Sequence, residues 1–89
     1  MAKYPRMVNR LFWYENEDGS GMVRNKRGED HHLDRTLFQF WKRMDGKHDP
    51  YTVMPELDKE DVVLLLYMLE NGGLLRRRGL WRKRWVASS

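Results

Sequence analysis

Two helices are encoded in HLDRTLFQFWKRMDGKHDPYTVMPELDKEDVVLLLYMLENGG, which runs from His32 to Gly73. Each helix has its own start and stop signals, and a linker containing Pro50 and Pro55 separates them. Because proline restricts its own backbone and that of the preceding residue, this linker can hold at most one short helical turn, begun by Asp49. The helix–linker–helix unit is the centre from which the rest of the fold is predicted.

The first helix is predicted over residues 34–44. Asp34 is a good N-cap, because its carboxylate can accept hydrogen bonds from the free backbone N–H groups of the first turn. Leu33 and Phe38 occupy the hydrophobic-staple positions around this cap, and Gly46 is expected to close the helix in a left-handed conformation. One helical face then carries the apolar side chains that we expect in the core: Leu37, Phe40, Trp41 and Met44.

The second helix opens with the same device at Leu57-Asp58 and ends at Asn71-Gly72-Gly73. Asp61 occupies the position where Glu or Gln would complete a capping box. The predicted inner stripe is Val62, Leu65, Leu66 and Leu69, and further apolar residues widen it almost all round, namely Val63, Leu64 and Met68. This much apolar surface predicts two packing neighbours, or one neighbour and a groove that holds a partner.

The segment before the helices predicts an antiparallel meander. Residues 7–14 are rich in β-forming side chains, and turn residues fill positions 15–21. Residues 21–27 can return as a second strand, and residues 29–33 form a short third strand after a reversal at Gly28. This third strand is predicted from its place between a turn and an N-cap, since its composition is poor for β-structure.

The composition predicts one globular domain over residues 1–89, with a core at 7–75 and a basic, tryptophan-rich tail at 76–89. The hydrophobic content of 40% and aromatic content of 12% exclude a disordered chain. The fold class is α+β and winged-helix-like: a three-stranded antiparallel meander, a helical core, and a tail that is either a β-ribbon or a helix. A ribbon would turn at Gly79, whereas a helix would place Trp81 and Trp85 on one face.

Residue types exclude several classes of function. The absence of cysteine excludes a disulfide framework, a thiolate zinc site, an iron–sulfur cluster and a cysteine nucleophile. No signal peptide and no apolar run long enough to cross a bilayer occur, so we expect a cytoplasmic location and no membrane partner. No catalytic residue, metal site or cofactor is predicted. His31 and His32 would point to opposite faces of a strand, which disfavours a metal site built with His48.

Two sequence motifs lie in the predicted core. The first is Leu33-Asp34-x-Thr36 followed by Phe40-Trp41-Lys42-x-Met44-Asp45-Gly46-Lys47, and the second is Asp61-Val62-x4-Tyr67-x-Leu69-x3-Gly73-Leu74-Leu75. The first resembles the L-N-x-T…I-W…L-D-G-x core of PqqD-like proteins, and the second is similar to that family's last helix and its L…L-x-x-x-G-L-L ending. These proteins are RiPP recognition elements, which hold precursor peptides for modifying enzymes. The resemblance covers residues 10–75, although the linker is shorter than in that family and the tail lies outside its core.

The resemblance implies a binding module that is not an enzyme. Its partners would be a precursor (leader) peptide and a peptide-modifying enzyme such as a radical SAM protein. The peptide would add as a strand beside the third strand, at Glu29, Asp30, His31, His32 and Leu33. The wall of its groove would be the outer side of the last helix, at Val63, Leu66, Tyr67 and Glu70. An exposed strand edge would also allow self-pairing into a homodimer.

The net charge of +4 is unevenly distributed, and it supports an alternative. The tail combines cations with tryptophans that could neutralise phosphates and stack on bases: Arg76, Arg77, Arg78, Trp81, Arg82, Lys83, Arg84 and Trp85. The second helix argues against a nucleic acid, because Glu60, Asp61 and Glu70 would repel phosphate. The alternatives are therefore a winged-helix nucleic-acid-binding protein, or a small phage or regulatory adaptor. The tail could equally dock the partner enzyme.

Overall fold

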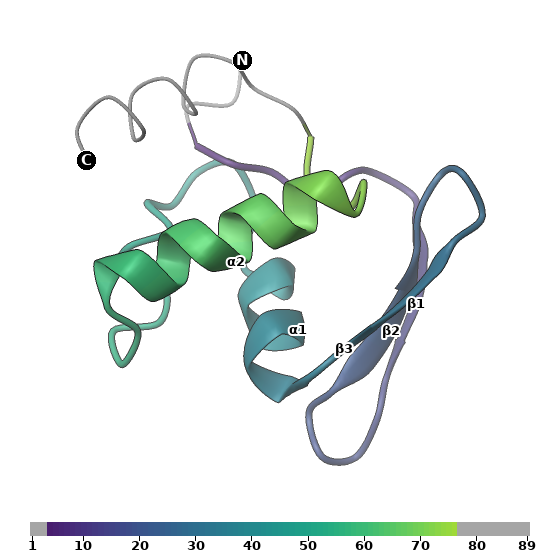
Figure 1. Ribbon diagram of the computed structural model, residues 1–89, viewed down its shortest axis with the longest axis horizontal. Helices are drawn as coiled ribbons and strands as arrows, with labels where there is room; N and C mark the ends of the chain where they lie inside the picture. Colours follow the sequence, from purple (N-terminus) through teal and green to yellow (C-terminus); the bar gives the residue numbers. More distant parts are fainter. Residues whose placement is uncertain (1–3, 77–89) are drawn as a thin grey trace.

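A three-stranded antiparallel sheet precedes two helices in the computed structural model (Figure 1), which makes the fold a small α+β unit. The structure describes residues 4–76. The predicted ribbon or helical tail therefore lies outside the described residues, apart from its first residue, Arg76. No helix within residues 4–76 has the length and the apolar composition needed to cross a membrane.

The predicted meander is confirmed. Strands β1 (Phe12–Glu15), β2 (Gly21–Arg24) and β3 (Asp30–Leu33) lie in the order β1-β2-β3, so β1 and β3 form the two edges of the sheet. Side chains alternate between its faces, because successive residues of a strand point in opposite directions. The inner face carries Trp13, Val23 and His31 in one cross-strand row, and the outer face carries Tyr14, Met22 and His32 in the next.

The predicted start of the first strand is wrong. Arg10 has a φ of 61°, a left-handed conformation that interrupts an extended strand, and β1 begins only at Phe12. The residues before it make isolated bridges with distant segments instead, Arg6 with Asp45 and Met7 with Leu75. Their β-forming composition therefore serves tertiary pairing and not the meander.

Helix α1 (Arg35–Lys42) begins as predicted. The Asp34 side chain accepts a hydrogen bond of 2.9 Å from the backbone N–H of Leu37. The helix ends earlier than residue 44, with Arg43 as its C-cap. Gly46 does have a left-handed φ of 81°, but it does not close the helix; its N–H donates to the carbonyl of Pro5 and fastens the N-terminal segment.

Helix α2 (Lys59–Asn71) also begins as predicted, because the Asp58 side chain accepts from the N–H of Asp61 at 2.9 Å. Gly73 follows its end with a φ of 77°. Three members of its predicted inner stripe are buried, namely Val62, Leu66 and Leu69. The linker forms turns and no helix, and its Asp49–Thr52 turn is closed by the Thr52 N–H.

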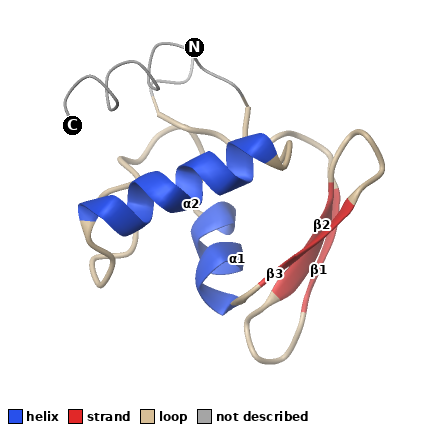
Figure 2. Cartoon of the chain, viewed as in Figure 1, coloured by secondary structure: helices blue, strands red, loops and turns tan. Residues whose placement is uncertain are grey.

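Helix α1 lies between the sheet and α2 (Figure 2), and it packs against β2, β3 and α2. Trp41 is the largest fully buried side chain and belongs to α1, as predicted. Its indole N–H donates to the carbonyl of Leu74 at 2.9 Å, which ties the segment after α2 to the core. Phe38 and Trp13 complete an aromatic cluster with Trp41 that joins α1 to β1.

Candidate binding site at the edge of β3

The outer edge of β3 exposes unpaired backbone groups. The N–H of Asn25 donates to the carbonyl of Glu29 at 2.9 Å and closes the β2–β3 hairpin. Because paired and unpaired residues alternate in an antiparallel ladder, His31 and Leu33 bond to β2, whereas Asp30 and His32 direct their N–H and C=O groups away from it. Within residues 4–76, these groups of Asp30 and His32 have no backbone partner. An extended peptide could pair with them.

The C-terminal end of α2 lies beside the start of β3. A Cβ placed on Gly72 would lie 3.3 Å from Cε1 of His31, so the side-chain direction at position 72 points toward β3. Residues four and seven positions apart share one helical stripe, and Met68 and Leu65 therefore lie on the same flank as Gly72. Leu65 is half-buried, whereas Met68 is 47% exposed. The flank is apolar and accessible.

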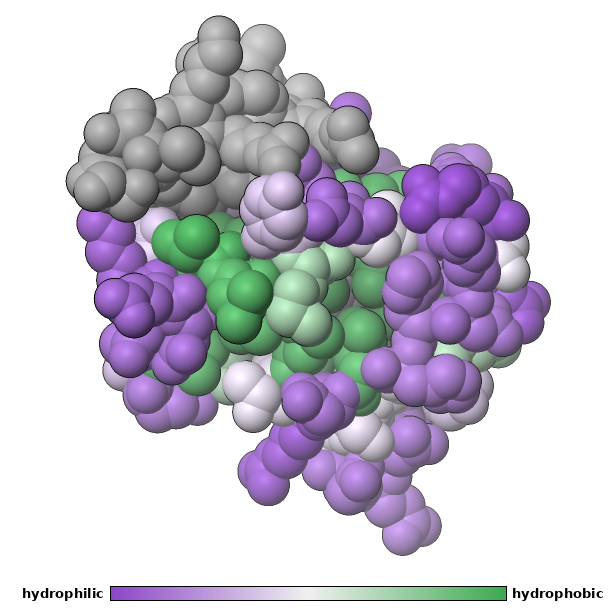
Figure 3. Space-filling view, in the orientation of Figure 1, coloured by the Kyte–Doolittle hydropathy of each residue, from purple (hydrophilic) through white to green (hydrophobic). Residues whose placement is uncertain are grey.

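A space-filling view shows the same arrangement (Figure 3). Apolar side chains gather over α2 and continue into the strip between this helix and the sheet, and hydrophilic side chains surround them. The exposed apolar residues of the helix are Val63, Leu64, Tyr67 and Met68. Because apolar side chains lie between an open strand edge and a helix, this surface combines the two features that recognition of an extended peptide needs.

The predicted groove wall needs correction. Leu66 is 2% exposed and belongs to the core, and Glu70 is 3% exposed, so neither lies on the outer side of α2. Val63 and Tyr67 are exposed, but the helical repeat places them on the flank opposite Gly72. Both flanks of α2 are apolar, and the helical repeat puts Leu65 and Met68, not Val63 and Tyr67, on the flank of Gly72, whose side-chain direction points toward His31 of β3.

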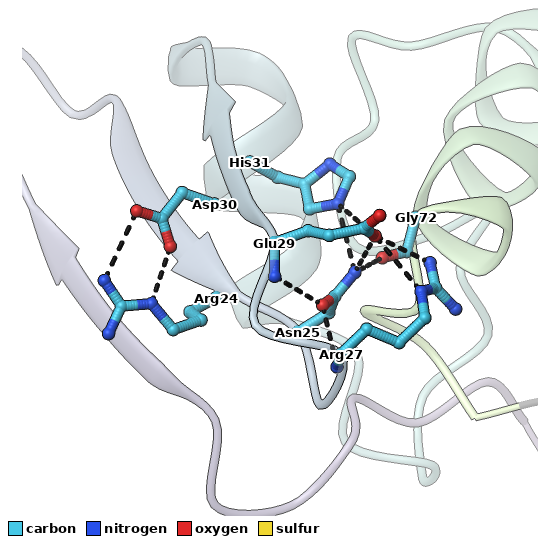
Figure 4. A network of polar contacts seen from close by, with 7 residues as sticks. All are labelled: Arg24, Asn25, Arg27, Glu29, Asp30, His31 and Gly72. Atoms are coloured by element: carbon cyan, nitrogen blue, oxygen red, sulfur yellow. Dashed lines mark hydrogen bonds and ion pairs between the residues drawn. The ribbon is translucent and has the colours of Figure 1, made fainter.

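A polar network closes one end of the strip (Figure 4). The Asn25 amide nitrogen donates to Oε1 of Glu29 at 2.7 Å and to the carbonyl of Gly72 at 2.8 Å. Its amide oxygen accepts from the N–H groups of Arg27 and Glu29. Nε2 of His31 lies 3.2 Å from the same amide nitrogen. The network fixes the C-terminal end of α2 against the first residues of β3.

The charged residues of the β3 segment have partners of their own. Asp30 forms an ion pair with Arg24 at 2.6 Å on the outer face of the sheet, and this guanidinium lowers the pKa of the Asp30 carboxyl. Hydrogen bonds from Asn25 and then Arg27 lower the pKa of Glu29. These carboxylates are therefore ionised at neutral pH and shape the hairpin, so the backbone of β3 is the part of this segment best suited to a peptide.

His31 and His32 point to opposite faces of the sheet, as their adjacency predicts. His31 is half-buried on the inner face and His32 is exposed on the outer face. His48 lies elsewhere, with Nδ1 at 2.8 Å from Asp45. Among residues 4–76, no group of three or more His, Asp or Glu side chains could hold a metal ion.

Comparisons of the chain with protein-family models, with curated proteins and with solved structures gave no match. Of the residues that build this candidate site, the β3 edge stays a prediction from the sequence, whereas Asn25, Leu65 and Met68 were not among the predicted site residues. A local signal for Asn25 does exist, because Asn25-Lys26-Arg27-Gly28 has the Asn and Gly positions of a type I turn. That signal indicates the turn and gives no indication of Gly72.

Proposed function

We propose that this chain is a non-catalytic peptide-recognition module that binds a precursor (leader) peptide by strand addition at β3. The observation that carries the proposal is the open edge at Asp30 and His32, next to the C-terminal end of a helix whose Gly72 flank is apolar. Main-chain hydrogen bonds would supply affinity regardless of sequence, and alternate side chains of the peptide would enter the apolar strip and supply selectivity.

The chemistry of the strip indicates which peptides would fit. On an added strand, every second side chain would face the same side as His31 and would meet Leu65 and Met68. Those positions should be aliphatic or aromatic. The intervening side chains would lie on the outer face beside His32 and the Arg24–Asp30 pair, where polar or charged residues are suited.

The resemblance to PqqD-like proteins extends this proposal to what happens to the bound peptide. A module with a winged-helix-like order of sheet and helices would present the bound peptide to a modifying enzyme, such as a radical SAM protein, in the cytoplasm. A small domain with one binding edge can hold the peptide while leaving its reactive part free for the enzyme. The basic tail would then be available for docking to that enzyme.

Amide hydrogen exchange tests the site residue by residue. The probes are precursor peptides encoded beside this chain's gene and a synthetic peptide with alternating apolar and polar residues. Strand addition should slow exchange at Asp30 and His32, because their N–H groups point outward, and should change His31 and Leu33 little, because β2 already protects them. Binding without this alternating protection would show that the peptide lies elsewhere.

Salt dependence separates peptide binding from the nucleic-acid alternative. Binding to duplex or single-stranded DNA should weaken steeply with salt, because each neutralised phosphate releases counterions. Strand addition into an apolar strip should depend on salt only mildly. Titrations of the peptides and of both DNA forms at two salt concentrations give the comparison. Salt-sensitive binding to DNA, with no binding to any peptide, would overturn the proposal in favour of the alternative.

A further inference from the structure

The opposite edge of the sheet is also open. The N–H of Asn16 donates to the carbonyl of Ser20 at 2.7 Å and sets the ladder of the β1–β2 hairpin, so Phe12 and Tyr14 bond to β2. Trp13 and Glu15 direct their N–H and C=O groups outward, and within residues 4–76 these groups have no backbone partner. Natural edge strands are commonly protected by lysine, proline or a bulge. β1 has no lysine, proline or bulge, although it is short and carries Glu15 at its end.

Three consecutive aromatic side chains accompany this edge. Phe12, Trp13 and Tyr14 are each more than two-fifths exposed, which is unusual for the largest apolar residues of a small domain. Helix α1 covers only part of this surface: Phe38 and Trp41 pack against Trp13 on the inner face, whereas Phe12 and Tyr14 lie on the opposite face. The edge therefore offers backbone pairing and aromatic surface together, and both strand faces beside it are accessible.

We infer that β1 pairs with β1 of a second copy in an antiparallel ladder whose two-fold axis passes through Tyr14. In this register, Trp13 lies opposite the partner's Glu15 and Glu15 lies opposite the partner's Trp13. All the outward backbone groups of β1 are then paired by residues of β1 itself. A register centred on Trp13 would instead pair Glu15 with Leu11, which lies outside the strand and follows the left-handed Arg10.

The charges on the inner face favour a second copy over another partner. Nζ of Lys42 lies 2.5 Å from Glu15 and 5.7 Å from the centre of the Trp13 ring. Across the two-fold axis, each Trp13 and its Lys42 would meet the partner's Glu15, so cations and carboxylates alternate around the axis. On the outer face, each Tyr14 ring would meet its own symmetry mate, an aromatic pair that antiparallel strands stabilise.

This pairing joins two sheets into one of six strands. Its outer edges would be the two β3 strands, so the dimer leaves both copies of the proposed peptide site open. The inference does not depend on the proposed function, because β1 and β3 are different edges. Two peptide sites on one assembly would favour precursors or enzymes that are themselves dimeric, through a higher effective concentration.

Light scattering at increasing protein concentration measures the mass of the full chain, and we expect a concentration-dependent dimer. Tyr14→Lys should weaken dimerisation by more than about tenfold, because it places two like charges across the two-fold axis. Tyr67→Lys makes the same change at an exposed residue of α2 and should leave the dimer unchanged. A monomer at all concentrations, or equal effects of both variants, would overturn the inference.

Single cysteines test the register, since the chain contains no cysteine. Tyr14→Cys should form an intermolecular disulfide on mild oxidation, because the two-fold axis brings position 14 opposite itself. Phe12→Cys should not, because its symmetry mate would lie four residues along the strand, about 14 Å away. Efficient cross-linking at position 12 with none at position 14 would show that β1 does not pair in this way.

Discussion

The side-chain amide of Asn25 donates a 2.8 Å hydrogen bond to the carbonyl oxygen of Gly72, which joins residues 47 positions apart. Asn25 is only 4% exposed, so each of its polar groups needs a partner. Its amide oxygen accepts two backbone N–H groups of the β2–β3 turn while its nitrogen holds the end of α2. One residue therefore sets both the turn before β3 and the position of α2 relative to β3.

Asn25→Asp tests the donor role of this amide. The carboxylate keeps the acceptor for the turn but would face the Gly72 carbonyl and the Glu29 carboxylate without a hydrogen to donate. We expect a loss of about 1–3 kcal/mol in the free energy of unfolding, measured with urea by circular dichroism at pH 7. Asn25→Ala should cost a similar amount. Wild-type stability in the Asp variant would mean that the bond to Gly72 contributes nothing.

Position 21 requires glycine because its backbone lies against the ring of Phe38. A Cβ on Gly21 would lie 2.4 Å from Cε1 of this fully buried ring, far inside the contact distance. Gly21→Ala should therefore destabilise the fold by about 1–3 kcal/mol, as overpacked cores do. The double variant Gly21→Ala/Phe38→Leu should lose less than the sum of the two single losses, because the smaller side chain makes room. Strictly additive losses in a thermal or urea series would show that the contact does not matter.

The Glu15–Lys42 pair predicts a pH-dependent contribution to stability. The hydrogen bond from Lys42 holds the pKa of the Glu15 carboxyl below its ordinary value of 4.5. The unfolded chain thus takes up this proton at a higher pH than the folded chain, and the contribution is present above pH 4.5 and lost as the pH falls through the lower, folded pKa.

Lys42→Met should accordingly lower the midpoint of thermal unfolding more at pH 7 than at pH 3, and NMR should show the Glu15 pKa rising toward 4.5. Part of the difference should persist at pH 3, since Nζ of Lys42 also lies over the rings of Trp13 and Phe38. Lys26→Met, an exposed lysine of the β2–β3 turn, is the control. An equal lowering of the unfolding midpoint at pH 7 and at pH 3 would indicate that Lys42 stabilises the fold only through its contacts with the two rings.

The parts of the fold that sequence could predict depend on local chemistry. Asp34 and Asp58 cap their helices because the capping carboxylate bonds only three residues along the chain. The burial of Trp41 and Leu66 follows from helical periodicity in the same way. The left-handed φ of Gly46 was also predictable, but its role was not, since its bond to Pro5 depends on the path of the N-terminal segment.

The candidate site shows why the remainder could not be predicted. Periodicity shows that α2 is apolar on both flanks, but only its rotation against the sheet decides which flank faces β3. That rotation is fixed by contacts at Gly72 with Asn25 and His31, which no local pattern encodes. The sequence prediction therefore chose Val63 and Tyr67, whereas Leu65 and Met68 share the flank of Gly72, the position that points toward His31.

Met68 and Tyr67 therefore provide a matched test of the proposed peptide site. Both are about half exposed, at 47% and 55%, and they occupy neighbouring positions on opposite flanks of α2. Burying the exposed half of a methionine side chain is worth about 1 kcal/mol. Met68→Ala should thus weaken peptide binding about fivefold in a calorimetric titration, while Tyr67→Ala should leave it within error. Urea unfolding of both variants must first show that neither change disturbs the fold. Should Tyr67→Ala abolish peptide binding and Met68→Ala have no effect, the peptide would lie on the far flank of α2, and the β3 edge would not be its site.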